Sequence, residues 1–167
     1  MLKAIKYSPD AVPFLPAIYE HKAWFIGEIP SHVCRHADLL TRSLLMEYEQ
    51  LQTAALTIGI DIYNIEAEAL GCPVTFFDDT RVPLIAHNDH IVQCTEDLKI
   101  LKLPNPLRDG RMPLHLETAR WLRRELGDSV WIRGAVSGPC SLAMNLVGSN
   151  AFLMAIHLDP DLIQALL

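Results

Sequence analysis

The chain has 167 residues, of which 50% are apolar, and this length favours one domain. Its net charge of −6 argues against nucleic acid or anionic membranes as partners. Its four cysteines form no CxxC pair, the first residues lack the apolar core of a secretion signal, and no stretch is long enough to span a bilayer. We therefore predict a cytoplasmic protein with reduced thiols that binds neither nucleic acid nor membrane.

The N-terminal third is predicted to contain an irregular arm followed by one long helix. Four prolines interrupt residues 1–30 and prevent a long helix there. Residues 31–58 repeat apolar positions at three- and four-residue steps, which indicates a helix with one buried stripe that ends at Gly59.

The middle third is predicted to contain short strands and turns. Residues 60–65 are rich in β-branched side chains and indicate a strand, and residues 66–70 indicate a helical turn. Residues 73–86 predict a hairpin with its turn at 78–81, and residues 95–112 predict a short helix and a loop.

The C-terminal third contains the most informative pattern. Residues 113–126 form an amphipathic helical pattern, and the β-rich run 130–136 enters a turn, Ser-Gly-Pro, before an apolar helix over 139–147. Two further helices are predicted at about 150–158 and at 160–167, the second with an apolar stripe and no cap. A strand that enters a helix through a small-residue turn is where α/β folds place ligands.

This order of elements predicts an α/β fold with parallel strands joined by helices. Only two such strands are predicted, whereas a parallel pair with two apolar faces needs further strands and an eight-stranded barrel needs about 250 residues. We therefore predict the N-terminal part of a (β/α)8 TIM barrel that is incomplete in this chain. Residues 1–30 are the arm and residues 31–167 the first part of the barrel domain.

Three segments resemble the uroporphyrinogen decarboxylase (URO-D) superfamily: GIDIYNIEAEALGCPV (59–74), LPNPLRDGRMP (103–113) and the run from residue 130 to 167. This superfamily contains porphyrinogen decarboxylases and cobalamin-dependent methyltransferases that move methyl groups to thiols such as coenzyme M. The resemblance implies a (β/α)8 barrel, of which this chain corresponds to about the first half.

The resemblance favours the methyltransferase branch. Decarboxylases of the family carry an arginine-rich segment near the N-terminus that pairs with substrate carboxylates, and here the corresponding region offers only Arg35. We predict a segment of a corrinoid-dependent methyltransferase that acts on a small-molecule substrate or with a corrinoid protein. The alternatives are a uroporphyrinogen decarboxylase of porphyrin biosynthesis, and a truncated, non-catalytic module that needs a partner chain or a second copy. Alone, the chain is expected to be inactive.

Two groups of polar residues follow the predicted strands and are the candidate site. Asn64 lies at the end of the first predicted strand and Glu66 directly after it, where barrel enzymes place catalytic groups. Glu66 is alternatively an ordinary first-turn helix acid. Ser137, Gly138 and Ser141 surround the end of the second strand, where exposed N–H groups can bind substrate; alternatively, the glycine serves packing.

No metal site is assigned to the chain. His32, Cys34 and His36 have a spacing that suits zinc, but Cys34 points to another side, so we favour a partly exposed helix start. In the methyltransferase branch the resemblance implies zinc bound by a His-x-Cys pair and a distant cysteine, and all three ligands would lie beyond residue 167. Zinc and corrinoid are thus implied only for the complete enzyme.

The one cluster of basic residues lies on the amphipathic helix. Arg120, Arg123 and Arg124 are predicted to face solvent and to pair with Glu117 and Glu125.

Overall fold

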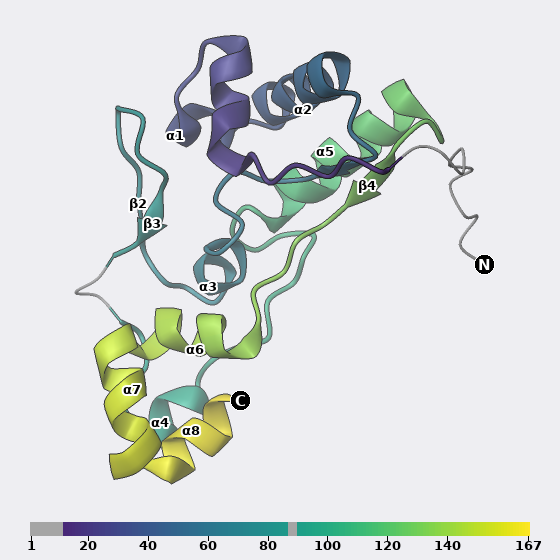
Figure 1. Cartoon of the computed structure of the whole chain (residues 1–167). Helices are drawn as coiled ribbons and strands as arrows, with labels where there is room; N and C mark the ends of the chain where they lie inside the picture. Colours follow the sequence, from purple (N-terminus) through teal and green to yellow (C-terminus); the bar gives the residue numbers. More distant parts are fainter. Residues whose placement is uncertain (1–11, 87–89) are drawn as a thin grey trace.

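The computed structural model describes residues 12–86 and 90–167, which form a mixed helix and strand fold (Figure 1). Helices pack against a short parallel pair of strands in one part, and a second group of helices lies below this part in Figure 1, beyond a small hairpin. In the N-terminal half the elements are the 3-10 helix η1 (Tyr19–Ile26), α1 (Pro30–Val33), α2 (Ala37–Leu51), β1 (Ala55–Thr57), α3 (Ile65–Ala69), β2 (Val74–Thr75) and β3 (Leu84–Ile85). In the C-terminal half they are α4 (Thr95–Leu98), α5 (Met112–Leu126), β4 (Trp131–Arg133), α6 (Pro139–Val147), α7 (Ser149–Leu158) and α8 (Pro160–Leu166).

Strands β1 and β4 pair in parallel, as predicted for two strands joined by helices. Leu56 pairs with Ile132 in the register of the two strands, and Leu56 is fully buried. It belongs to a core that α2 and α5 supply with Leu40, Leu44 and Leu122. The crossover between the strands places both carboxyl ends at the same edge.

The predicted helix over 31–58 is wrong in its extent. The chain forms the short α1, breaks at Cys34 to His36, and continues as α2 only to Leu51. Gln52 then ends the helix in the left-handed region with φ of 49°. The apolar pattern continues past this point because the next residues form the buried strand β1. The strand predicted at 60–65 therefore lies earlier in the chain, at Ala55–Thr57, and Gly59 follows this strand and does not end a helix.

The arm is also more ordered than predicted where it is described. Residues 19–26 form η1, which packs against α2 and buries Lys22 and Ala23. Residues 1–11 lie outside the described part of the chain. The division into an arm and a barrel domain stays a prediction.

The hairpin and the C-terminal helices agree with their predictions. Strands β2 and β3 pair antiparallel, with Val74 opposite Ile85. A second core joins α6, α7 and α8 to the hairpin through residues such as Leu146, Phe152 and Leu162.

The outer side of α7 leaves several apolar side chains exposed, among them Leu153, Met154 and Leu158. Within the described residues, no single helix has the length and hydropathy to cross a membrane. Only α6 and α7 taken together meet these criteria, and they meet at 103°.

The described residues form two two-stranded sheets, one parallel and one antiparallel. The α/β class is therefore confirmed, and the incomplete TIM barrel stays a prediction.

Candidate functional site

The loops that leave β1 and β4 form the centre of the site, because both begin at the same edge of the parallel pair. The first loop begins with Gly59, whose φ of 109° is in the left-handed region. A Cβ atom on Gly59 would lie 3.0 Å from Cε1 of His115 and 2.8 Å from Ile62, so a larger residue does not fit. This close approach fixes the path of the loop that carries Asp61 and Asn64.

Asp61, within this loop, forms a buried ion pair with Arg111. The two guanidinium nitrogens Nη1 and Nη2 of Arg111 donate to Oδ1 and Oδ2 of Asp61 at 2.9 and 2.7 Å, and Nε donates to Glu68 at 2.6 Å. Burial alone would lower the pKa of Arg111, but the hydrogen bonds and charge of Asp61 more than offset this and raise it. Arg111 therefore stays charged and ties the loop after β1 to the start of α5.

Asn64 is held by the same network. Its Nδ2 donates to Asp61 Oδ2 at 3.2 Å and to the carbonyl oxygen of Pro83 at 2.6 Å. The side chain also lines a cavity of about 120 Å³ between the hairpin and α6. The other lining residues are Leu84, Ile85, His90, Met144, Asn145 and Ser149.

Glu66 lies on α3, near Asn64 in sequence but apart from this cavity. It is absent from the cavity lining, and its Oε2 atom is buried without a hydrogen-bond partner among the described residues. The structure therefore brings Asn64, and not Glu66, to the cavity wall.

The three candidate substrate-binding residues after β4 lie either near the loop after β1 or exposed to solvent. Ser137 donates its hydroxyl to the carbonyl oxygen of Tyr63 at 3.3 Å, whereas Gly138 and Ser141 are exposed. Gly138 has an extended backbone, φ −68°, and a Cβ atom built on it would meet no atom of the described residues within 4 Å, so the described part of the chain shows no packing contact that requires this glycine. Asn145 on α6 donates to the same Tyr63 carbonyl at 2.9 Å, so α6 is tied to the first loop.

His115 lies behind the loop, against Gly59. Burial lowers the pKa of its imidazole to about 4, and its Nε2 atom has no hydrogen-bond partner in the described part of the chain. The ring is therefore neutral near pH 7 and acts as an uncharged wall beside Asp61 and Arg111.

A second buried charge pair supports β1 from the arm. Lys22 Nζ donates to the carbonyl oxygens of Thr57 and Gly59 at 2.8 and 3.3 Å and lies 3.4 Å from Glu47 Oε2. Burial lowers the pKa of Lys22 and raises the pKa of Glu47. The contact anchors the carboxyl end of β1, from which the site loop departs.

The sequence analysis missed Asp61, Arg111, His115 and Asn145. One signal was available for Asp61, since a lone acid in an apolar run is rarely buried without a partner. Its partner, Arg111, lies in a stretch predicted as a loop.

Across residues 12–86 and 90–167, no group of three metal-ligating side chains is close enough to hold one ion. His32 contacts Glu28 at 3.1 Å, His36 contacts the carbonyl oxygen of His32, and Cys34 is buried with its pKa raised to about 12 by burial. All four cysteines are free thiols, and Cys140 is exposed.

Comparisons with known proteins assign the chain to a family. The family profile described as uroporphyrinogen decarboxylase (URO-D) matches residues 2–167. The chain belongs to the URO-D family. It is 31% identical over 79% of its length to the methylcobamide:CoM methyltransferase MtbA of Methanosarcina acetivorans, and 28% identical over 81% of its length to the uroporphyrinogen decarboxylase of Psychromonas ingrahamii.

The fold of this URO-D family member resembles a methyltransferase from Methanosarcina mazei with a TM-score of 0.77 and 25% sequence identity. That likeness covers 94% of this chain and 47% of the methyltransferase, and the chain spans 38% of the length of each curated relative. The fold is thus similar to part of a known methyltransferase.

Proposed function

We propose that this chain is the N-terminal part of a corrinoid-dependent methyltransferase that moves a methyl group to a thiol. The observation that carries the proposal is the match to the methylcobamide:CoM methyltransferase, at 31% identity over 79% of the chain. The fold likeness to a second methyltransferase supports the same branch. The proposed enzyme is a barrel whose remaining strands come from further polypeptide.

In this proposal the chain supplies part of the substrate pocket. Both Nδ2 hydrogens of Asn64 are used by Asp61 and Pro83, which leaves its Oδ1 atom to accept a hydrogen bond from a substrate. Glu66 is proposed to act as an acid or base, or to orient another group, once substrate is bound. Ser137, Gly138 and Ser141 are proposed to bind the substrate through the start of α6.

Zinc is not assigned to this chain, because the described residues do not form a ligand set for it. In the proposed enzyme, zinc keeps the acceptor thiol deprotonated when bound, and its ligands come from the remaining polypeptide. The corrinoid, free or on a partner protein, supplies the methyl group. The residues described above position Asn64 and shape the cavity wall.

A uroporphyrinogen decarboxylase is the second candidate, and the 28% identity to a decarboxylase is the observation in its favour. A substrate with many carboxylates needs free guanidinium groups. Arg111 is committed to Asp61 and Glu68, which makes it unavailable to a substrate carboxylate and favours the methyltransferase. Arg35 is exposed and donates only Nε, to the Ser31 carbonyl, with its guanidinium 4.8 Å from the Phe76 ring centre.

The third candidate is a module that works only with a partner chain or a second copy. The two-stranded parallel sheet and the exposed apolar side of α7 support a need for further polypeptide. This candidate differs from the first in having no chemistry of its own.

The test is to co-express the chain with the part of the Methanosarcina acetivorans methyltransferase that lies beyond the matched region. The co-purified pair is given methylcobalamin and a thiol, and loss of the cobalt–methyl absorbance is followed. We expect transfer that the chain alone does not support, and a higher KM for the thiol in Asn64→Ala than in the control Asn105→Ala. A pair that forms but decarboxylates uroporphyrinogen instead would overturn the proposal, and a pair with neither activity would favour the non-catalytic module.

A further inference from the structure

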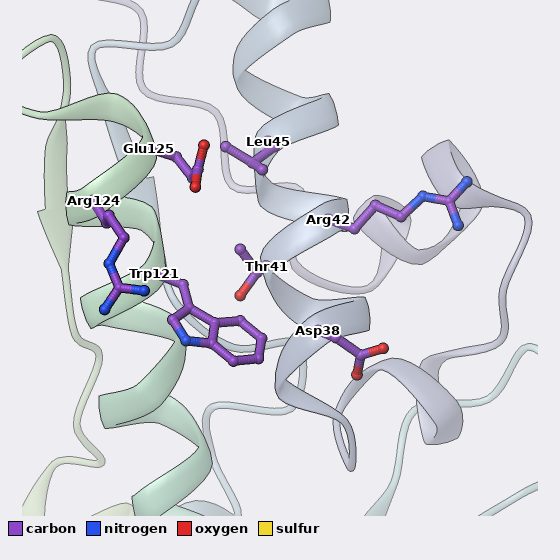
Figure 2. Close-up of a pocket in the computed structure, with 7 residues that line it drawn as sticks. All are labelled: Asp38, Thr41, Arg42, Leu45, Trp121, Arg124 and Glu125. Carbon is purple, nitrogen blue, oxygen red and sulfur yellow. The ribbon is translucent and has the colours of Figure 1, made fainter.

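Charge distinguishes the groove between α2 and α5 from the cavity beside Asn64. The groove, of about 390 Å³, is lined by two acids and two arginines around a tryptophan side chain (Figure 2). The predicted pairing of the α5 arginines with Glu117 and Glu125 is wrong, since Arg123 pairs with Asp128 instead. Because both signs of charge line this groove, it does not select a ligand by charge. The cavity is different, since its described lining contains neither arginine nor lysine.

Asn64 presents an acceptor atom to the cavity. Its Nδ2 group lies 3.2 Å from the carboxylate of Asp61 and 2.6 Å from the Pro83 carbonyl, and neither partner can donate a hydrogen bond. These partners fix the orientation of the amide, so Oδ1 is the atom left for a ligand. Asn64 is only 6% exposed, and within the described residues its Oδ1 accepts no hydrogen bond. A ligand that donates to Oδ1 satisfies this buried group, and one that cannot donate leaves it unpaired.

Asn145 and His90 add acceptors to the same cavity. The Nδ2 group of Asn145 donates to the Tyr63 carbonyl at 2.9 Å, which fixes this amide and leaves its Oδ1 for a ligand. Nδ1 of His90 lies 3.4 Å from the Asn145 carbonyl oxygen, so Nδ1 carries the hydrogen and Nε2 of the neutral ring is an acceptor. Side-chain donors are fewer, namely the Ser149 hydroxyl and the second hydrogen on Asn145 Nδ2.

The buried network next to Asn64 carries an excess of negative charge. Asp61 and Glu68 both pair with Arg111, at 2.7 and 2.6 Å, so two carboxylates share one guanidinium group. Asn64 is bonded directly to one of these carboxylates. Because charges interact more strongly in a poorly hydrated interior than in water, this excess favours a cation in the cavity and disfavours an anion.

The volume of the cavity restricts its ligand to a small group. Liquid water takes about 30 Å³ per molecule, so the cavity of about 120 Å³ has room for the equivalent of about four waters. A corrinoid ring is much larger than this, whereas the short tail of a thiol fits. Leu84, Ile85 and Met144 give the cavity an apolar side against which a short carbon chain can pack.

We propose that the cavity beside Asn64 binds an ammonium group, and that the methyl acceptor is a small aminothiol. This inference rests on the proposed methyl transfer and names the substrate class of the same site. A protonated amine has three N–H donors and a positive charge, which suit the acceptors of Asn64, Asn145 and His90. A sulfonate or carboxylate tail has acceptors only, and it would leave those atoms unpaired.

The test measures the binding of three thiols of equal chain length to the unmodified chain by isothermal titration calorimetry. The thiols are 2-mercaptoethylamine, 2-mercaptoethanol and 2-mercaptoethanesulfonate, which differ only in the tail. We expect the amine to bind about tenfold more tightly than the alcohol, because hydrogen bonds from a charged donor are stronger than those from a neutral one. The sulfonate should bind more weakly than the alcohol. Equal affinities, a preference for the sulfonate, or no binding by a folded chain would overturn the inference.

Ser149 and Asn150 provide matched charge variants. Both are exposed residues at the start of α7, but only Ser149 lines the cavity. Ser149→Lys should weaken binding of the amine by about tenfold and Ser149→Asp should strengthen it, whereas Asn150→Lys and Asn150→Asp should each change it by about twofold or less. Circular dichroism should show that all four variants are folded. Equal effects at the two positions would place the amine outside the cavity and contradict the inference.

Failure of this inference and failure of the methyl-transfer proposal give different results. Amine binding by the chain, without methyl transfer by the co-expressed pair, would support the cavity assignment and contradict the proposed function. Methyl transfer with equal KM values for the three thiols would support the proposed function and overturn the inference.

Discussion

The core around α2, α5 and β1 encloses two buried ion pairs, whereas the described core around α6, α7 and α8 contains no buried charged side chain. A buried ion pair requires its partners to be held at one distance and angle, since an unpaired buried charge is strongly unfavourable. Apolar helix packing tolerates small shifts more easily. The first core therefore fixes the geometry of the loop after β1, and the second core supplies a less constrained side of the cavity beside Asn64.

The largest effect is expected at Arg111, which ties the two elements of the first core together. Replacing Arg111 with Ala leaves Asp61 buried without a partner and should lower the free energy of unfolding by about 3–5 kcal/mol in urea denaturation. Arg108→Ala, at an exposed position three residues away, is the control and should leave the midpoint unchanged. An equally small effect of both changes would contradict the role given to the ion pair.

The double variant D61L/R111M sharpens this prediction. Replacing both charges with apolar groups removes the cost of the unpaired charge, so most of the lost stability should return. If the double variant is as unstable as Arg111→Ala, packing around Arg111 matters more than its charge.

The next largest effect is expected from truncating the apolar part of the same core. Leu122 is fully buried, so Leu122→Ala should lower the free energy of unfolding by about 2–5 kcal/mol. Leu153, on the outer side of α7, is 55% exposed, and Leu153→Ala should change stability by about 0.5 kcal/mol or less. Comparable losses at the two positions would show that α7 is covered in solution.

The pH dependence of stability is expected to come in part from His115. Its folded-state pKa of about 4 lies below the ordinary value of 6.5, so the neutral ring stabilises the fold above pH 6.5. This contribution, about 3 kcal/mol, is lost as the pH falls from 6.5 to 4. His115→Leu should remove this part of the pH dependence, and the exposed His157→Leu should retain it. Unfolding curves of both variants, measured at several pH values, test this prediction, and an unchanged pH dependence in His115→Leu would contradict it.

The smallest effect is expected in the second group of helices. Asp159 caps α8 by accepting a hydrogen bond from the Leu162 amide at 3.1 Å, so Asp159→Ala should cost about 1 kcal/mol of stability. Asp161→Ala, within the first turn, is the control and should cost less. Equal losses would indicate that the helix dipole, and not the cap, accounts for the effect of Asp159.

Much of the fold was predictable because its signals are local. The amphipathic pattern of α5, the hairpin and the turn before α6 each depend on a few neighbouring residues, and the structure confirms them. The end of α2 was not predictable in the same way, because the buried residues of β1 continue the apolar pattern of the helix without a glycine or proline between them. A strand of three residues is too short to show its own period.

Of the candidate site, only the position of Asn64 near a strand end could be predicted, and its role stays a prediction. Asn64 follows β1 and reaches the cavity wall, as its place after a strand suggested. Its partners could not be foreseen, since Asp61 meets Arg111 fifty positions along the chain and Asn145 reaches the loop from α6. Contacts of that kind depend on how α3, α5 and α6 pack, which no local pattern encodes.

Methyl transfer by the chain co-expressed with the part of the Methanosarcina acetivorans methyltransferase that lies beyond the matched region tests the proposed function most directly. The account predicts that the cobalt–methyl absorbance of methylcobalamin decays in the presence of a thiol, at a rate that depends on this chain and is reduced at limiting thiol by Asn64→Ala. Decay that is equally fast without this chain, or no decay from a stable and folded complex, would contradict it.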